Sequence, residues 1–205
     1  MNYYYQANMS FPREIIKRFI VAGYPILYLV SWEEERVERM VKLLGAELFS
    51  NPVEFYTWSC VDGMRSNGTE IGETRDLIQA LNRVISDEEA GVYLSNPELI
   101  RKLRDVYRIL RSSCKTLFIL SPVLILPNEL QKEVAVVDIG LPDMDELGGI
   151  FDTVLGSHKN SEKTWGSLTP VLREKCIHAM IGLGFVEAEL ALRRALVERE
   201  FVDEG

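Results

Sequence analysis

Residues 31–36 form the strand-to-helix junction at which this sequence could carry phosphate chemistry. Residues 24–31, YPILYLVS, predict a buried strand, and WEEERVERMVKLLG predicts the helix that follows. A loop that binds a nucleoside triphosphate at such a junction has the pattern G-x-x-x-x-G-K-[ST], in which backbone N–H groups, a lysine and a hydroxyl hold the phosphates and Mg²⁺. This junction has no glycine and no lysine, and it carries Ser31, Trp32 and Glu33 instead. Carboxylates suit the positive end of a helix dipole but repel a polyphosphate, so we expect a vestigial site and no bound cofactor.

Two positions in this segment predict where its helix begins and ends. Ser31 is expected to be the N-cap of a helix over 33–44, with Glu34 three residues later completing a capping box. Gly45 is expected to end the helix.

The elements that position the junction alternate along the chain. Continuous apolar strands are predicted between amphipathic helices, at 26–30, 53–60, 91–95, 116–121 and 134–140. Such a rhythm predicts an α/β fold in which a doubly wound, mostly parallel, five-stranded sheet is covered on both faces. Residues 61–74 are expected to be a long loop.

The last part of the chain has helical patterns and no strand between them. This change predicts an α/β core over 1–141 and a small C-terminal helical subdomain over 142–205. The apolar side of the last helix, with Val186 and Leu190, is expected to pack on the preceding helix around Ile177 and Ile181.

Composition excludes several classes of function. The 205 residues carry a formal net charge of −8, with 47% hydrophobic and 26% charged residues, which is typical of a folded globular protein and unfavourable for general nucleic-acid binding. Two histidines and three cysteines lie far apart and form no metal-binding spacing, so no metal site is expected. The unpaired cysteine pattern favours a reducing compartment. The apolar stretch at 19–30 is too short to span a membrane and is interrupted by Gly23 and Pro25.

Several ordered segments resemble one known family. The segments are YPILYLVSWEEERVERMV, Trp58 with Gly63, SPVLILPNELQKEVAVVDIGLPDMDEL and IGLGFVEAELALRRAL. Together they resemble, over residues 12–200, the N-terminal degenerate AAA-like domain of an AAA ATPase family first named as a hypothetical chloroplast reading frame. That family occurs in cyanobacteria, red-algal plastids and other bacteria. The resemblance implies a P-loop-like core with a helical lid, normally followed by an intact AAA ATPase module.

The resemblance also assigns three further nucleotide-site positions. Asn96 stands where an AAA core ends its third strand with the acidic pair that holds Mg²⁺, and Ser121 stands at the polar sensor after the fourth strand. Lys132 stands near the arginine finger but lacks the planar fork of a guanidinium. Each has an ordinary structural alternative: a turn before Pro97 for the asparagine, a strand stop for the serine, and a surface position for the lysine.

A separate basic surface is predicted on the helix that begins at Pro97. Its side chains include Arg101, Arg104 and Arg108, which could bind an acidic partner or a nucleic-acid backbone; the alternative is a solvated helix face.

These observations predict a catalytically inactive AAA-like domain, without catalytic, cofactor-binding or metal-binding residues, that is not itself an enzyme and acts through protein contacts. Its expected partner is an AAA ATPase module in cis or in trans, or another copy of the chain, in the cytoplasm or the plastid stroma. No membrane partner is expected, and a nucleic-acid partner is not favoured. Two alternatives stay open: a nucleotide-binding AAA ATPase with an atypical site, and a domain that binds nucleic acid or a signalling nucleotide.

Overall fold

The computed structural model divides the chain into two compact units, Met1–Ile139 and Gly140–Gly205. It describes residues 4–5, 12–59, 61–66, 69–72, 76, 78–81, 97–157 and 169–202. Cys60, His158 and the strand predicted at 91–95 lie outside these residues. Among the described residues, no helix is long and apolar enough to cross a membrane.

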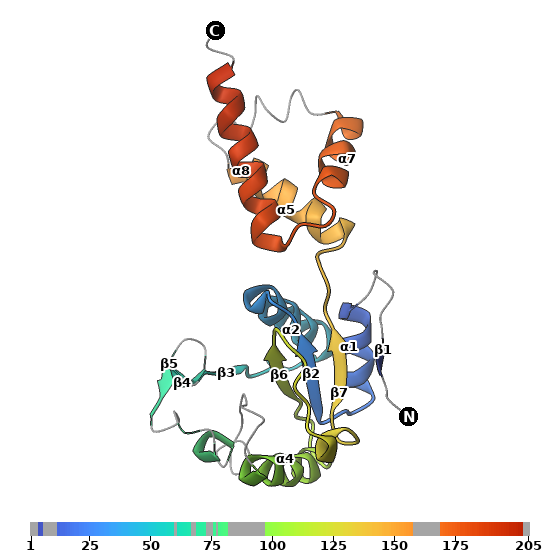
Figure 1. Ribbon diagram of the computed structural model, residues 1–205, viewed down its shortest axis with the longest axis vertical. Coiled ribbons are helices and arrows are strands. Elements are labelled where there is room, and N and C mark those ends of the chain that lie inside the picture. Colours follow the sequence, from blue (N-terminus) through green and yellow to red (C-terminus); the bar gives the residue numbers. More distant parts are fainter. Residues whose placement is uncertain are drawn as a thin grey trace. The chain divides into compact units, whose positions relative to one another are not determined.

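The first unit is built on a parallel sheet in the order β1-β7-β2-β6 (Figure 1). Its central strand β2 (Ile26–Val30) pairs with β6 (Leu117–Ser121) on one side and with β7 (Ala135–Asp138) on the other. The two-residue β1 (Tyr4–Tyr5) pairs with the outer edge of β7. The expected α/β class with a parallel sheet is therefore confirmed, whereas the five-stranded count is not.

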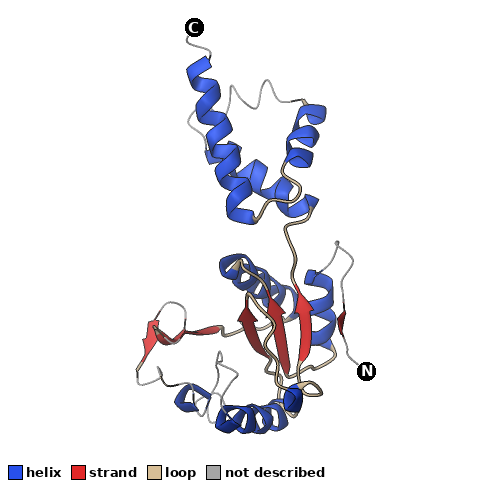
Figure 2. Ribbon diagram, in the orientation of Figure 1, coloured by secondary structure: helices blue, strands red, loops and turns tan. Residues whose placement is uncertain are grey.

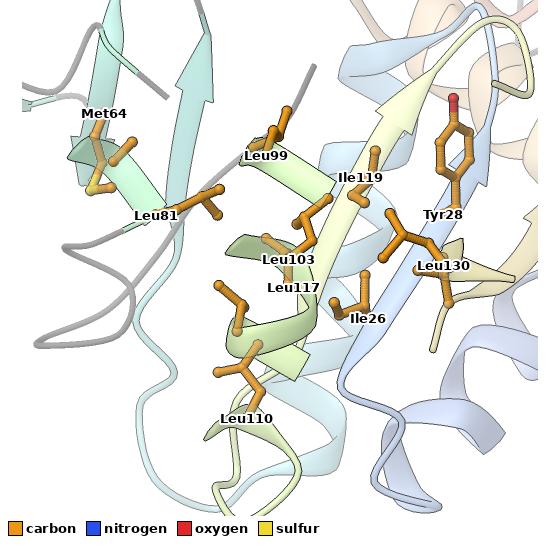
Figure 3. Close-up of a cluster of buried hydrophobic side chains, with 13 residues drawn as sticks. Ile26, Tyr28, Met64, Leu81, Leu99, Leu103, Leu110, Leu117, Ile119 and Leu130 are labelled. Carbon is orange, nitrogen blue, oxygen red and sulfur yellow. The ribbon is translucent and has the colours of Figure 1, made fainter. Parts of the chain in front are cut away.

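Helices cover both faces of this sheet. Strand β2 is apolar at every position, so its side chains on both faces are buried. Leu27 and Leu29 face α1 (Pro12–Val21) and α2 (Glu34–Leu48) in one buried cluster. Ile26 and Tyr28 face α4 (Pro97–Leu110) in the other. Figure 3 shows this second cluster between α4 and the strands. A strand buried on both faces is typical of a parallel sheet between two helical layers.

Helix α2 corrects two predictions. Its N-cap is Glu33, whose side chain makes no capping hydrogen bond, and Ser31 lies two residues earlier. The helix also continues through Gly45 to Leu48. Gly45 serves packing instead, because a Cβ there would lie 2.4 Å from the ring tip of Phe55.

The segment predicted as a second parallel strand, 53–60, forms part of a separate antiparallel sheet. In the order β3-β4-β5, β3 (Tyr56–Ser59) pairs with β4 (Gly63–Ser66), and β4 pairs with β5 (Thr69–Ile71). The prediction of a loop throughout 61–74 is therefore wrong for Gly63–Ser66 and Thr69–Ile71. The Asn67-Gly68 dipeptide, outside the described residues, is the sequence type that favours a tight hairpin, and a hairpin pairs a strand with its neighbour in sequence.

The described part of the second unit is helical, with α5 (Met144–Ser157), α7 (Pro170–Ala179) and α8 (Phe185–Val202) around one apolar core (Figure 2). Arg173 of α7 donates two hydrogen bonds to Asp152 of α5, at 3.0 and 2.7 Å. The expected inward face of α8 is wrong, because Ala188 and Leu192 are buried.

The side chains expected on that inward face are distributed differently. Val186 and Leu190 are exposed, as is Ile181, while Ile177 is buried as expected. Helix α8 packs mainly on α5, and this partner selects a different stripe of the helix.

Candidate functional site

The candidate site is the carboxyl edge of the parallel sheet, where β2, β6 and β7 end side by side. The Ser31 N–H donates to the Ser121 carbonyl at 3.0 Å, and the Ile139 N–H donates to the Val30 carbonyl at 3.0 Å. After β2 the chain enters α2 on one face of the sheet, whereas the loop after β6 packs on the α4 face. Connections that leave neighbouring strands toward opposite faces create the crevice in which open α/β sheets bind ligands.

The β2–α2 junction is held by interactions within the chain. The Ser31 hydroxyl is buried and accepts a hydrogen bond from the Glu33 N–H at 3.1 Å. The Arg36 side chain is only 3% exposed, and its Nε lies 3.1 Å from a Glu33 carboxylate oxygen. This ion pair neutralises the charge that α2 buries in its first turn, as burial of a charged group requires.

The loop after β6 is fixed by the buried side chain of Tyr28. The Tyr28 hydroxyl donates to the Val123 carbonyl at 2.7 Å and accepts from the Ile125 N–H at 3.3 Å. In Figure 3 this hydroxyl points away from the strand, toward the end of the sheet where the loop lies. Leu124 and Leu126 pack on the α4-side core, whereas Val123 and Ile125, which alternate with them along the chain, are exposed.

Ser121 lies beside Ser31, but its hydroxyl serves the same loop. It donates to the Val123 carbonyl at 2.9 Å and accepts from the Val123 N–H at 3.4 Å. The two serines at the crevice therefore both have hydrogen-bond partners within the chain.

Exposed apolar side chains flank these serines. Trp32 is 80% exposed in the β2–α2 junction, and in the β6 loop Val123 is 47% and Ile125 60% exposed. The edge of the sheet therefore presents apolar surface from two adjacent loops.

The structure brings together Ser31, Trp32, Glu33 and Ser121, but Lys132 lies elsewhere. Lys132 is exposed in the turn that precedes β7, at the amino end of that strand, and so at the opposite edge of the sheet. Asn96 lies outside the described residues. Sequence reasoning missed Tyr28, Val123 and Ile125, because the run of four apolar side chains at 123–126 does not indicate which of them are exposed.

The arginines of α4 are all paired with carboxylates. Arg104 Nε lies 3.3 Å from Glu133, and Arg101 and Arg108 lie 3.6 and 3.1 Å from Asp105. These pairs lower the positive charge that this face can offer to an anionic partner.

Two other features of the described residues do not form a stronger site. An open hollow of about 380 Å³ lies on the exposed side of α2, lined by Glu35, Glu38, Arg39, Lys42 and Leu43, and its charges are mixed. Within the described ranges, histidine, cysteine and carboxylate side chains form no group of three or more that could hold a metal ion.

Comparison with known proteins identifies the family. The family described as SpoVK-like AAA ATPase, N-terminal domain, matches residues 12–139, more than half of the chain. An AAA domain-containing protein, ycf46, of Trieres chinensis is 29% identical over 209 residues, which are 96% of this chain and 40% of that protein. The ycf46 protein of Guillardia theta is 29% identical over 150 residues, 68% of this chain and 29% of that protein. No solved structure matches the chain.

These matches confirm the resemblance and correct one prediction. The expectation that the chain is not an enzyme is wrong, because the family is one of AAA ATPases and the relatives are AAA domain-containing proteins. The chain spans 40% or less of the length of these two relatives. It belongs to the family of N-terminal domains of SpoVK-like AAA ATPases.

Proposed function

We propose that this chain is the protein-interaction or assembly domain of an AAA ATPase and is normally attached to an active AAA module. The observation that carries the proposal is its membership of an N-terminal domain family of AAA ATPases, together with its coverage of less than half of its relatives' length. A domain that works beside an ATPase module can contribute by docking on that module, on a neighbouring copy, or on the module's target.

The carboxyl edge of the sheet supports binding of protein at this domain. The Ser31 and Ser121 hydroxyls are engaged within the chain, and the β2–α2 junction presents Trp32 and carboxylates where a phosphate site would present glycine and lysine. Aromatic side chains of this kind are enriched at protein interfaces.

We propose further that the helical unit is the lid of an AAA-like core and that this core contains a doubly wound, five-stranded sheet. The shared apolar core of α5, α7 and α8 supports the first proposal. The alternation of apolar strand patterns and amphipathic helix patterns in the sequence supports the second. A second copy of the chain is an additional partner in this proposal, and the cytoplasm or the plastid stroma is its expected location.

The test is reconstitution with an AAA ATPase module from the same cell, recognised by an intact G-x-x-x-x-G-K-[ST] loop. We expect this chain to bind that module in analytical ultracentrifugation and to change its assembly state or its rate of ATP turnover. If the module sediments and turns over ATP identically with and without the chain, the proposal is wrong.

A nucleotide site of atypical form is the second candidate, because the family is one of AAA ATPases and the crevice lies where α/β folds bind nucleotides. Arg36 supplies a cation at the first turn of α2, and its pairing with Glu33 would have to change for it to meet a phosphate. Calorimetry with Mg²⁺-ATP tests this candidate: saturable heat that is lost in Arg36→Met supports it, and absence of heat excludes it.

Nucleic acid is not favoured as a partner. The arginines on the basic face of α4 are paired with carboxylates, Asp105 of the same helix and Glu133 before β7, and the net charge of the chain is −8.

A further inference from the structure

We propose that the carboxyl edge of the parallel sheet binds a basic peptide segment that carries an apolar anchor. The binding surface is formed by Trp32, Val123 and Ile125, which we call the carboxyl-edge patch. This inference rests on the proposed function and names the class of partner that the domain would recognise.

The patch is apolar and is contributed by two loops at the same end of the sheet. Trp32 follows directly on Ser31, whose N–H bonds the Ser121 carbonyl, and Val123 lies two residues beyond that carbonyl. The three side chains are 80%, 47% and 60% exposed. Tryptophan is among the residues that contribute most to binding energy at protein interfaces, because it buries a large area at low entropic cost.

The patch is also held in place before a partner arrives. The Tyr28 hydroxyl bonds both the Val123 carbonyl and the Ile125 N–H, and Tyr28 is buried in the central strand of the sheet. Leu124 and Leu126 anchor the same loop in the α4-side core. Because the inward contacts already order the loop, the loop would lose little conformational entropy when a ligand binds its outward face.

Charge selects a basic occupant. Glu34 and Glu35 are exposed in the first turn of α2, directly after Trp32 and Glu33. Asp138 is exposed at the carboxyl end of β7, the neighbouring strand. Lysine or arginine side chains beside an apolar anchor would meet these carboxylates and could stack on the exposed indole, whereas an acidic segment would be repelled.

The test selects partners by chemistry rather than by name. A phage-displayed library of random linear peptides is panned on the full chain, and the enriched peptides are synthesised with a fluorescent label. We expect enrichment of lysine and arginine around leucine or an aromatic residue. Binding, followed by fluorescence anisotropy, should weaken as the salt concentration rises.

Matched variants assign the binding to the patch. Trp32→Ala is expected to weaken binding of the selected peptides about 30-fold, as for a residue that dominates an interface. Leu43→Ala, at an exposed apolar position of α2 outside the patch, should leave it unchanged. The double change Glu34→Gln and Glu35→Gln should reduce both affinity and salt dependence, whereas Glu129→Gln, an exposed carboxylate beyond the opposite end of the sheet, should not.

Four outcomes would overturn the proposal: no enrichment, enrichment of acidic peptides, enrichment without basic residues, or equal binding by the Trp32→Ala variant. All substituted positions are exposed, and circular dichroism of each variant checks that the fold is kept. If no peptides bind while the chain still binds an AAA module, the peptide-binding proposal is wrong and the proposed assembly function is retained. If the peptides bind as expected while the module does not, the proposed assembly function is wrong and the peptide-binding proposal is retained.

Discussion

Replacing Gly45 by alanine is expected to destabilise the first unit, although alanine favours a helix. Gly45 lies inside α2, and an added Cβ would stand 2.4 Å from Phe55 Cζ and 3.2 Å from Cε2. Contacts this short force the ring to move, and Phe55 packs on the cluster between α2 and the sheet. The substitution therefore sets a gain in helix propensity against a steric cost in packing.

The two effects have comparable magnitudes. Alanine in place of glycine in a helix interior contributes about 1 kcal/mol of stability, whereas overpacking costs about 1–3 kcal/mol. We expect a net loss of about 0–2 kcal/mol for Gly45→Ala in the natural background. With Phe55→Leu in place, the ring tip is absent and the same alanine should stabilise by about 1 kcal/mol. The coupling between the two sites is then about 1–3 kcal/mol.

Urea unfolding of the natural protein, the Gly45→Ala and Phe55→Leu variants and the double variant measures the coupling. Tryptophan fluorescence in a Trp165→Phe background reports on the first unit, because its remaining tryptophans, Trp32 and Trp58, both belong to that unit. Midpoints should shift without a change of slope if each variant unfolds from the same native state. Equal stabilisation by Gly45→Ala in both backgrounds would refute the packing argument.

Three further predictions concern α8, α1 and α7. Leu192 is 9% exposed, so Leu192→Ala should lower the free energy of unfolding, measured by heat or urea, by about 2–5 kcal/mol. Leu190 is 60% exposed, so Leu190→Ala should change it by less than about 0.5 kcal/mol. Equal effects of the two variants would contradict the assignment of Leu192, and not Leu190, to the buried face of α8. The hydrogen bond from Lys17 lowers the pKa of Glu47 in the folded protein. The pair therefore stabilises the fold above the unfolded-state pKa of Glu47, and this stabilisation is lost as the pH falls through the lowered folded-state pKa. An NMR titration of Lys17→Met should show a higher pKa for Glu47 than in the natural protein, and an unchanged pKa would contradict this cause. Thr169→Ala removes the hydroxyl that caps α7 and should cost about 1 kcal/mol, most of which Thr169→Ser retains.

Local sequence signals predicted the elements that depend on local chemistry. Pro12 begins α1, and Gly23, with a positive φ of 72°, follows its end as expected. The continuous apolar run of β2 correctly indicated a strand covered on both faces. These signals are reliable because capping and burial depend on residue types within a few positions of the element itself.

Pairing partners were less predictable, because β-forming residues specify a strand and not its neighbour. The segment 53–60 has the composition of a sheet strand, yet it pairs with the strand that follows it in sequence. Gly45 illustrates the same limit in a helix. A glycine is needed there because the Phe55 ring packs against it, and the sequence pattern of the helix gives no sign of that contact.

The candidate site was predicted in part. Ser31, Trp32 and Glu33 were identified because the strand-to-helix junction is visible in the sequence, but the outward-facing side chains of the β6 loop were not. Their position depends on the Tyr28 hydroxyl, and the bonded groups are 95 and 97 residues apart. The extent of each domain and the roles of the site residues stay predictions.

The separation of β2 from its partners has a consequence for folding during synthesis. The Tyr28 hydroxyl cannot form its hydrogen bond until Val123, 95 residues later, has been synthesised. At about 5–20 residues per second, this takes roughly 5–20 s on the ribosome. During that interval the apolar strand ILYLV has helices α1 and α2 beside it in sequence, but neither strand that will complete its hydrogen bonds. A nascent chain stalled before Leu117 would expose this strand, so rare codons or truncations in that stretch should increase its capture by chaperones.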